Sequence, residues 1–240
     1  MENIQLFQGD CLEIMKNIPD KSIDMILCDL PYGTTQNKWD SVIPLKPLWE
    51  QYERIIKDNG VIALFSQTPF DKILGASNLK LLRYEWIWKK AKPTGFLNAK
   101  KTPMKKHENI LIFYKKLPTY NPQGLIKDGK TMVSRTNKGN YGECSKTTIR
   151  EFTSYPNSIL RFSGVASKEQ LHTTQKPVDL LEYLIKTYTN DGEIVLDNCM
   201  GSGSTGIACV NTNRKFIGIE LDEKYFEMAK NRIENYEEEK

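Results

Sequence analysis

A glycine-rich segment near the C-terminus has the residue types and spacing of a nucleotide-binding loop. Residues 197–206 read DNCMGSGSTG and follow an apolar stretch at 193–197. Gly201 and Gly203 allow bare backbone to approach a ligand at the start of a helix. Glu220 ends the next apolar stretch, at the distance where a carboxylate accepts hydrogen bonds from a ribose diol. We therefore expect a cofactor that contains adenosine. The glycine pattern alone suits a dinucleotide equally well, and a tight turn without a ligand is the further alternative.

A second polar cluster, Asp29-Leu30-Pro31-Tyr32, ends the apolar stretch at 22–29. Ligands bind at the carboxyl ends of strands in open α/β sheets. Pro31 favours an extended Leu30, whose carbonyl is then free to accept a hydrogen bond. One carboxylate, one carbonyl and one aromatic ring suit an exocyclic amine on a planar base, because the two acceptors match its two N–H groups. A turn that merely contains a proline is the alternative.

These clusters need a scaffold that brings strand ends together, and the apolar pattern predicts one. Short apolar stretches bounded by turn residues indicate buried strands, and amphipathic stretches between them indicate helices. This alternation predicts an α/β sheet with helices on both faces, in which parallel strands end at one edge. Residues 116–170 lack the pattern and are expected to be irregular. The expected strands are 22–29, 60–66, 84–89, 108–115, 193–197 and 216–220, and the expected helices are 44–57, 69–79, 177–188, 204–210 and 223–238.

The charge of the chain is distributed unevenly. The 240 residues carry a net charge of +4. Residues 89–168 contain 17 Lys and Arg against 4 Asp and Glu, a local charge of +13, which leaves −9 for the rest. A basic block in an otherwise acidic protein suggests a surface that faces a polyanion, and a solvated lysine-rich face is the alternative. The candidate contacts to a nucleic acid are Lys89, Lys90, Lys100, Lys101, Lys105, Lys106, Arg135, Lys138 and Arg150.

The composition excludes several other classes of protein. Apolar residues make up 39% of the chain, which excludes collagen-like, low-complexity and wholly disordered classes. The apolar runs are far shorter than the roughly 18–20 residues of a membrane helix, and the N-terminus does not resemble a leader. Five widely spaced cysteines without a C-x-x-C pair, and two histidines, indicate neither a disulfide framework nor a metal site. We expect a cytoplasmic protein with no membrane partner and no metal.

Taken together, the motifs resemble the S-adenosylmethionine-dependent DNA amino-methyltransferases. Residues 29–32 are similar to the catalytic Asp-Pro-Pro-Tyr motif of that family, with Leu30 in place of the first proline. Residues 197–205 resemble its glycine-rich cofactor motif, with departures at Asn198, Cys199 and Ser204. Residues 172–177, 8–11 and 108–115 also resemble recurrent segments. The catalytic motif precedes the cofactor loop, which is the order of the family's β group.

The resemblance implies a circularly permuted Rossmann-like methyltransferase fold with a mostly parallel sheet and a small irregular target-recognition insert. The implied organisation is a catalytic half at 1–116, the insert at 117–170 and the cofactor half at 171–240. The implied activity is transfer of the methyl group of S-adenosylmethionine to the N6 amine of an adenine flipped out of duplex DNA. A homodimer and a cognate restriction endonuclease are further implied partners.

The resemblance also assigns roles to residues. The catalytic segment is Asp29, Leu30, Pro31 and Tyr32. Asp10 and Cys11 are expected at the adenine of the cofactor, and Asp10 as a helix cap is the alternative. Lys176 is expected near the carboxylate of the cofactor. The full set of expected cofactor-binding residues is Asp10, Cys11, Gln175, Lys176, Pro177, Asp197, Gly201, Ser202, Gly203, Thr205 and Glu220.

Three other functions remain open at this point. Methylation of cytosine at N4 uses the same acceptors, although that group tends to have Ser in place of Asp29. A dehydrogenase that uses NAD would suit the glycine loop, and it would leave residues 29–32 and the basic block unexplained. A DNA-binding module without catalysis is the third. Methylation of cytosine at carbon 5 is set aside, because in that family the nucleophilic cysteine follows a proline and none does so here.

Overall fold

The computed structural model describes residues 3–33, 41–133, 147–164 and 175–238. The chain divides into two compact units. The larger unit comprises Met1–Asn121 and Ser158–Lys240, and the smaller one is Pro122–Asn157. Each unit is described by itself below.

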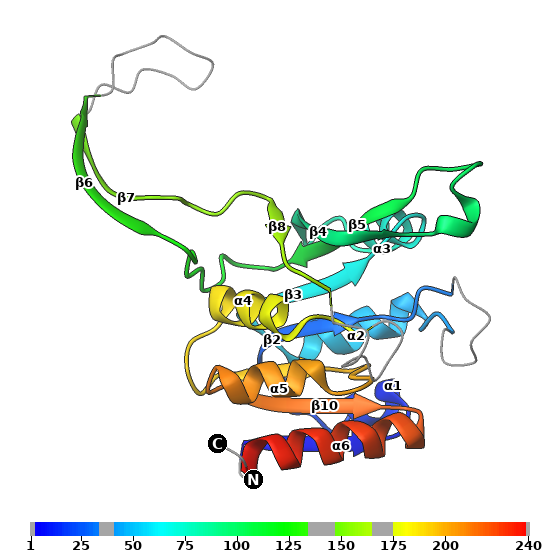
Figure 1. Ribbon diagram of the computed structural model, residues 1–240. Helices are drawn as coiled ribbons and strands as arrows, with labels where there is room; N and C mark the ends of the chain where they lie inside the picture. The colour runs from blue at the N-terminus through cyan, green and yellow to red at the C-terminus, as the bar shows by residue number, and fades with distance from the viewer. Residues whose placement is uncertain (1–2, 34–40, 134–146, 165–174, 239–240) are drawn as a thin grey trace. The chain divides into compact units, whose positions relative to one another are not determined.

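A mixed β-sheet runs through the larger unit (Figure 1). In the described part of the chain its strands follow the spatial order β1 (Ile4–Gln8), β10 (Lys215–Glu220), β9 (Ile194–Asp197), β2 (Ile23–Asp29), β3 (Ile56–Ser66), β5 (Lys105–Phe113), β4 (Leu82–Thr94) and β8 (Ile159–Arg161). The strands from β1 to β3 in this order pair in parallel. Strand β5 runs antiparallel to both β3 and β4, and β8 pairs in parallel with β4. The prediction of a mostly parallel sheet is confirmed.

Helices cover both faces of this sheet, as the sequence predicts. Helices α4 (Val178–Tyr188), α5 (Ser204–Asn211) and α6 (Glu223–Glu238) pack on one face, and α1 (Cys11–Met15), α2 (Leu45–Ile55) and α3 (Phe70–Ser77) pack on the other. Strand β2 serves both cores, because successive side chains of a strand point to opposite faces. Met25 and Leu27 join the core under α4, and Ile26 and Cys28 join the core under α2.

The strand ends that matter for chemistry meet at one edge of the sheet. Strands β2 and β9 are hydrogen-bonded neighbours, with Met25 opposite Val195. Asp29 and Asp197, the last residues of these strands, are therefore brought to the same edge although they are far apart in the sequence. Glu220 ends β10 on the other side of β9. This arrangement is the one that the parallel sheet predicts.

Helix α4 is fixed on the sheet by an aromatic cluster at its C-terminal end. The Tyr188 hydroxyl accepts a hydrogen bond from Trp86 Nε1 at 2.6 Å, and it shares another with the Tyr84 hydroxyl at 2.8 Å. Tyr188 is 2% exposed. A buried hydroxyl needs such partners, so these bonds set the position of α4 along the sheet. At the other end of α4, the preceding Lys176 contacts Asp29, the last residue of β2.

The segment expected to be irregular contains strands. In the smaller unit β6 (Ile126–Val133) pairs antiparallel with β7 (Thr147–Thr153), and in the larger unit β8 extends the main sheet. Charged residues interrupt the apolar alternation in these strands, which hides them from pattern analysis. Strand β4 extends to Thr94, beyond its predicted end at residue 89, because it stays paired with β5 after the apolar residues end. The 3₁₀ helix η1 (Phe96–Asn98) lies between β4 and β5.

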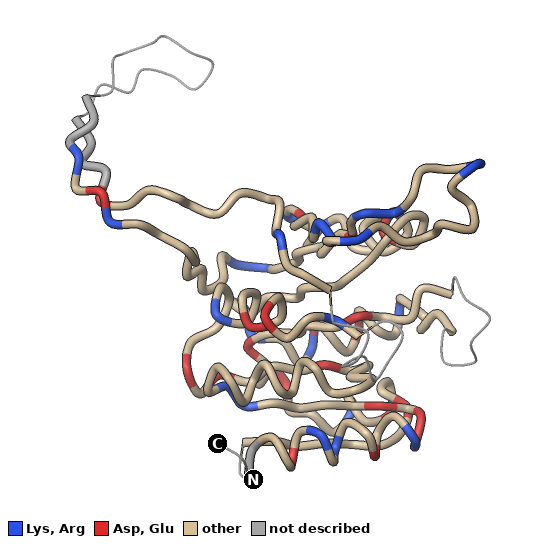
Figure 2. The backbone as a smooth tube through the Cα atoms, in the orientation of Figure 1, with Lys and Arg blue, Asp and Glu red and all other residues tan. Residues whose placement is uncertain are grey.

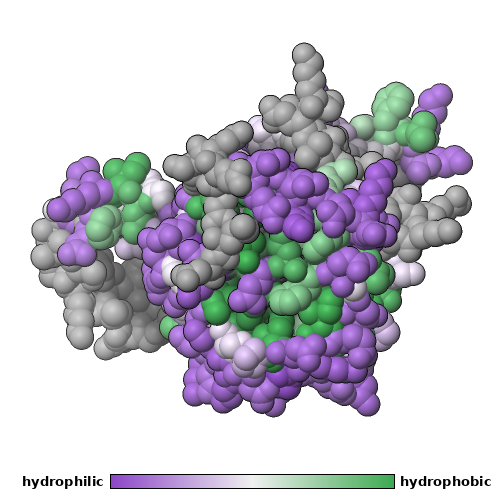
Figure 3. Space-filling model, turned by 90° about the horizontal axis from the view of Figure 1, so that it is seen from below, coloured by the Kyte–Doolittle hydropathy of each residue, from purple (hydrophilic) through white to green (hydrophobic). Residues whose placement is uncertain are grey.

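Strand β1 was also absent from the expected elements. It lies at the edge of the sheet, and its five residues, IQLFQ, are too few to show a clear pattern although three of them are apolar. Seen from the β1 edge, hydrophobic residues gather in the middle of the surface and hydrophilic residues surround them (Figure 3).

Within the described residues, every helix is too short or too polar to cross a membrane.

Candidate active site

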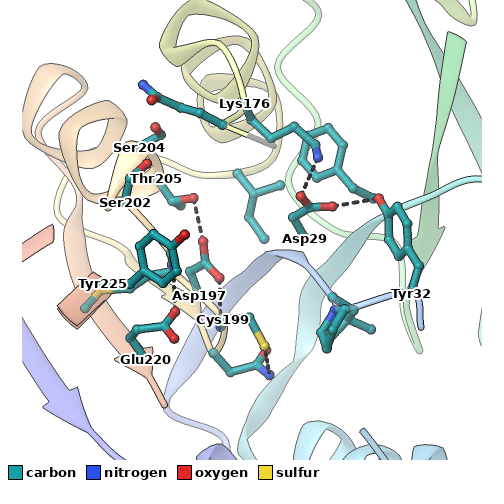
Figure 4. A pocket seen from close by; sticks show the side chains of 18 of the residues that line it. Asp29, Tyr32, Lys176, Asp197, Cys199, Ser202, Ser204, Thr205, Glu220 and Tyr225 are labelled. Atoms are coloured by element: carbon teal, nitrogen blue, oxygen red, sulfur yellow. Dashed lines mark hydrogen bonds and ion pairs between the residues drawn. The ribbon is translucent and has the colours of Figure 1, made fainter. Parts of the chain in front are cut away.

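A pocket with a volume of about 1230 Å³ opens at the edge where the parallel strands end. Its lining includes Gln8 from β1, Asp29 from β2, Asp197 from β9 and Glu220 from β10. The pocket therefore lies where ligands bind in open α/β sheets. Two groups of side chains line it, one around Asp29 and one around the glycine loop (Figure 4).

The Asp29 group begins with the four residues predicted to be catalytic, all of which line the pocket. The Tyr32 hydroxyl donates a hydrogen bond to Asp29 Oδ1 at 2.6 Å, and the Tyr32 ring stacks on Phe70 of α3 with centroids 5.3 Å apart. Leu30 is buried in the core under α2 and anchors the segment there. Burial raises the pKa of Tyr32 well above its usual range, and the charge of Asp29 adds to this effect. Tyr32 is therefore a permanent donor to Asp29.

Lys176 joins the same group and lies between two carboxylates. Its ammonium contacts Asp29 Oδ2 and lies 3.3 Å from Glu108 Oε2. Glu108 Oε1 forms a second ion pair with Lys90 Nζ at 2.5 Å. Lys176 and Glu108 are each 8% exposed, so these charges interact in a desolvated environment where pairing is strong. Lys176 also lines the pocket, and its expected place near the cofactor carboxylate stays a prediction.

Burial and neighbouring charges act on the pKa of each group. Burial raises the pKa of Asp29, the positive charge of Lys176 opposes this effect, and the negative charge of Glu108 reinforces it. Burial alone would raise the pKa of Glu108, but the charges of Lys176 and Lys90 outweigh burial and lower it. The pKa of Lys176 is raised, because its two carboxylates outweigh the effect of burial. Glu108 and Lys176 are therefore held in their charged forms.

The glycine loop after β9 is braced by Asp197. Asp197 Oδ2 accepts a hydrogen bond from the Thr205 hydroxyl at 2.6 Å, and Oδ1 accepts one from the backbone N–H of Cys199 at 3.1 Å. Burial raises the pKa of Asp197 to about 6, against the lowering effect of the bond from Thr205. The carboxylate that opens the loop thus also sets its shape.

The two glycines of the loop have different surroundings. Both adopt a left-handed backbone, with φ of +52° at Gly201 and +77° at Gly203. Nothing lies within 4 Å of a Cβ built on Gly201, which lines the pocket. A Cβ on Gly203 would lie 3.1 Å from Cβ of Ala229 in α6. Gly201 therefore exposes backbone to the pocket, whereas Gly203, which was expected to bind the cofactor, allows α6 to pack against the start of α5.

Asp10 and Cys11 are both among the residues that line the pocket. Asp10 is the N-cap of α1, and its Oδ1 accepts hydrogen bonds from the backbone N–H groups of Leu12 at 2.7 Å and Glu13 at 3.3 Å. It also lines the pocket, so the capping alternative and the ligand-facing position coexist. Cys11 is buried and accepts a hydrogen bond from Asn198 Nδ2 at 3.6 Å.

Most of the remaining residues that were expected to bind the cofactor line the pocket, and one does not. Gln175, Ser202 and Thr205 line the pocket. Pro177, the N-cap residue of α4, is not among the residues that line it. Residues 172–174 of the motif that precedes α4 lie outside the described residues.

Six of the expected DNA contacts, Lys89, Lys90, Lys100, Lys101, Lys105 and Lys106, lie on β4, β5 and the loop between them (Figure 2). Lys89, Lys100, Lys101, Lys105 and Lys106 are exposed. Lys90 differs from them, because it lines the pocket and is paired with Glu108. The side chain of Arg150 on β7 is not described. Arg135 and Lys138 lie outside the described residues.

Several pocket residues were not assigned a role from the sequence. Glu108 is the most consequential, and a carboxylate that opens the otherwise apolar stretch 108–115 was its signal. Phe65 and Trp88 line the pocket at strand positions that read simply as core. Tyr225 lies on α6 beside Glu220 in the view of Figure 4, and no motif pointed to it.

The chain is similar to known proteins over most of its length. A family model described as DNA methylase matches residues 23–231. The type II methyltransferase M.HpaI of Haemophilus parainfluenzae is 29% identical over 96% of this chain and 74% of that protein. The DNA adenine methyltransferase YhdJ of Escherichia coli K12 is 28% identical over 95% of this chain and 82% of that protein. The crystal structure of the M1.HpyAVI complex with S-adenosylmethionine superposes with a TM-score of 0.68 at 26% identity, covering 95% of this chain and 99% of that chain.

Proposed function

Because this chain belongs to the DNA methylase family of N6 and N4 amino-methyltransferases, we propose that it methylates the N6 amine of adenine in duplex DNA. Methyl transfer to DNA with S-adenosylmethionine as the cofactor follows from the family. The choice of base and the roles of single residues are the proposal.

One observation carries the catalytic part of the proposal: the Asp29 carboxylate ends β2 and faces the pocket at the edge where the glycine loop begins. An aryl amine is a poor nucleophile, because its lone pair is delocalised into the ring. Asp29 accepts one N–H of the amine and the Leu30 carbonyl accepts the other, which favours a pyramidal nitrogen with a localised lone pair. Positioning the amine in line with the methyl group then supplies most of the rate enhancement, a contribution of about 7–11 kcal/mol.

The residues around the glycine loop fit S-adenosylmethionine. The cofactor is cationic, and the carboxylates of Asp10, Asp197 and Glu220 all line the pocket. The backbone of Gly201 is open to the pocket, which permits close approach of a ligand. Asp197 and Thr205 hold the methionine portion, Glu220 binds the ribose, and Asp10 with Cys11 faces the adenine. When bound, the cofactor supplies a methyl group activated by a sulfonium.

The size of the pocket fits two occupants. Its volume of about 1230 Å³ exceeds the roughly 300–1,000 Å³ typical of a small-molecule site. The glycine loop takes the cofactor, and the space beside Asp29, Phe65 and Trp88 takes a flipped-out base. Extracting that base from the duplex costs a few kcal/mol, which contacts in the pocket must offset.

Adenine is favoured over cytosine by the identity of residue 29. The N4-cytosine enzymes tend to have Ser where this chain has Asp29. The adenine specificity stated in the name of YhdJ, which aligns over nearly the whole chain, supports the same choice. Cytosine N4 is the second candidate, because the two acceptors serve either amine.

Basic residues on the β4–β5 hairpin provide the contacts to DNA phosphates. The exposed lysines at 100, 101, 105 and 106 lie on this hairpin, and phosphate contacts position a protein on duplex DNA. We assign target recognition to the insert at 117–170. The type II methyltransferases among the relatives support a role in restriction and modification, with a cognate endonuclease as partner. The homodimer stays a prediction.

Long-read sequencing tests the function directly. DNA is sequenced from cells that lack other methyltransferases and express either the wild-type protein or the Asp29→Ala variant. We expect N6-methyladenine in one recurrent sequence context with the wild-type protein and no modification with the variant. A recurrent N4-methylcytosine would assign the protein to the second candidate function, and an unmodified genome would contradict both.

A further inference from the structure

Both carboxylate oxygens of Asp29 already have partners within the protein. Oδ1 accepts the hydrogen bond from the Tyr32 hydroxyl, and Oδ2 contacts the Lys176 ammonium (Figure 4). Each carboxylate oxygen can accept more than one hydrogen bond, so an incoming amine shares Asp29 with these partners, and the positive charge of Lys176 is its strongest competitor. Tyr32 is held by its stack on Phe70, so Lys176 is the partner that can move.

Lys176 has a second carboxylate within reach. Its ammonium lies 3.3 Å from Glu108 Oε2, and among the described residues no other group donates a hydrogen bond to this oxygen. Because Lys176 is 8% exposed, leaving Asp29 without another partner would strand a buried charge, which is strongly unfavourable. A small movement of the ammonium toward Glu108 avoids this.

Glu108 is itself fixed in place. Its other oxygen, Oε1, pairs with Lys90 Nζ at 2.5 Å, and the Lys90 ammonium lies 5.4 Å from the centre of the Trp88 ring. Glu108 follows His107 on β5, which pairs with β4, the strand that carries Lys90. The acceptor that faces Lys176 is therefore held by two strands of the sheet and needs no rearrangement.

We propose that Glu108 is a positioning residue that takes the Lys176 ammonium from Asp29 when the target amine enters, and so releases the Asp29 carboxylate to accept from that amine. This inference rests on the proposed function, because it gives Asp29 the same role. No bond is made or broken in the step. The ion pair between Lys176 and Glu108 becomes shorter as the one between Lys176 and Asp29 lengthens.

The simpler alternative is that Glu108 only balances the charges of Lys90 and Lys176. The two accounts differ in the rate of methyl transfer when Glu108 is neutralised, because charge balance alone leaves that rate unchanged. The groups that act on Asp29 are Lys176, Glu108 and Tyr32, and Asp197 lies across the strand ends. In Glu108→Gln the Lys176 charge acts on Asp29 alone, which lowers the Asp29 pKa and leaves the carboxylate sequestered.

The test compares Glu108→Gln with Glu108→Asp and with a matched control. Asp24→Asn is the control, because Asp24 is a buried carboxylate in an ion pair with Lys57, on β2 but outside the pocket. The measurements are the single-turnover rate of methyl transfer, the Kd for S-adenosylmethionine by calorimetry, and the pKa of Asp29 by ¹³C NMR of the cofactor-free protein. The Asp29 signal is assigned with Asp29→Asn.

We expect Glu108→Gln to lower the single-turnover rate about 10- to 100-fold, as loss of a charge-assisted hydrogen bond does. The Kd for the cofactor stays within about threefold of wild type, since the ion-pair partners of Glu108, Lys90 and Lys176, lie outside the glycine loop. The Asp29 pKa falls. Glu108→Asp keeps the charge on a shorter side chain, so its rate lies between those of the wild-type protein and Glu108→Gln. The control Asp24→Asn keeps the wild-type rate.

An unchanged rate or an unmoved Asp29 pKa in Glu108→Gln overturns the proposal. A parallel loss of rate in Asp24→Asn overturns it as well, because the effect is then a general one of buried charge. If Glu108→Gln does not fold, Glu108→Asp decides: a wild-type rate contradicts the proposal and a lowered rate with intact cofactor binding supports it. Failure of the proposed function is recognised separately, by the absence of a methylated amine with the wild-type protein.

Discussion

The backbone N–H of Gly201 donates a hydrogen bond to Glu220 Oε2 at 2.9 Å, and this bond ties the glycine loop after β9 to the end of β10. The other oxygen, Oε1, accepts from the backbone N–H of Asp222 at 2.9 Å. Glu220 is thus oriented from both sides before any ligand arrives. A carboxylate fixed in this way is preorganised to accept hydrogen bonds from a diol.

Replacing Glu220 should weaken cofactor binding far more than catalysis. In Glu220→Gln an amide NH₂ replaces one of the two acceptors and faces a backbone N–H, so the loop loses a charge-assisted bond. We expect the Kd for S-adenosylmethionine to rise about 10- to 100-fold, measured by calorimetry. Glu193→Gln is the control, because Glu193 also accepts a backbone N–H, from Asn190 at 2.8 Å, and lies outside the pocket. Equal losses in both variants would contradict the assignment.

The two loop glycines should respond differently to substitution by alanine. Gly203→Ala places a Cβ against Ala229 and Ile233 of α6, so we expect a loss of about 1–3 kcal/mol in the free energy of unfolding. Gly201→Ala meets open space and suffers only backbone strain of about 1 kcal/mol, but its methyl group projects where the loop faces the pocket. Urea unfolding and cofactor titration of both variants separate the effects. A more destabilising change at Gly201 than at Gly203 would contradict the packing of Gly203 against α6.

Cofactor affinity should depend on pH through Asp197. Burial raises the pKa of this group to about 6, so its ionised fraction grows as the pH rises through that value. The ionised carboxylate attracts a cationic ligand, and we therefore expect affinity for S-adenosylmethionine to rise between about pH 5 and pH 7 and then to level off. Calorimetry at several pH values measures this. The isosteric Asp197→Asn variant should bind the cofactor more weakly, and its affinity should not change with pH. If the affinity of this variant still rises with pH, a group other than Asp197 causes the pH dependence.

DNA binding should weaken steeply with salt, and the β4–β5 loop should account for part of the slope. Lys100 and Lys101 are exposed on this loop. Neutralising both as Gln should reduce the slope of log K against log salt by about 2, since each phosphate contact contributes about 0.9. The control replaces the exposed Lys80 and Lys224, which lie outside the basic block. Equal slopes for wild type and the loop variant would mean that these lysines form only a solvated surface.

The residues that could be predicted from the sequence are those fixed by local pattern. Asp29, Asp197 and Glu220 each end an apolar strand, and parallel strands share an edge, so their meeting in one pocket follows from pattern and topology alone. Helical periodicity likewise predicted α4 near its observed bounds, Val178–Tyr188.

What could not be predicted depends on contacts between distant elements. Lys176 precedes α4 and Glu108 opens an apolar run, and neither position indicates that the two side chains meet beside Asp29. Gly203 is part of the glycine motif in the sequence, but its packing against Ala229 depends on the position of α6, which the sequence pattern does not predict. Asp10 has two plausible roles from sequence, and it takes the cap of α1 while facing the pocket.

Nucleoside analysis of methylated DNA tests the central claim most directly. Purified wild-type protein and Asp29→Ala are incubated with duplex DNA and S-adenosylmethionine carrying a labelled methyl group, and the digested nucleosides are identified by mass spectrometry. Calorimetry confirms that both proteins bind the cofactor. The account predicts the label in N6-methyldeoxyadenosine with the wild-type protein and none with the variant. Label in N4-methyldeoxycytidine, or equal incorporation by Asp29→Ala, would contradict it.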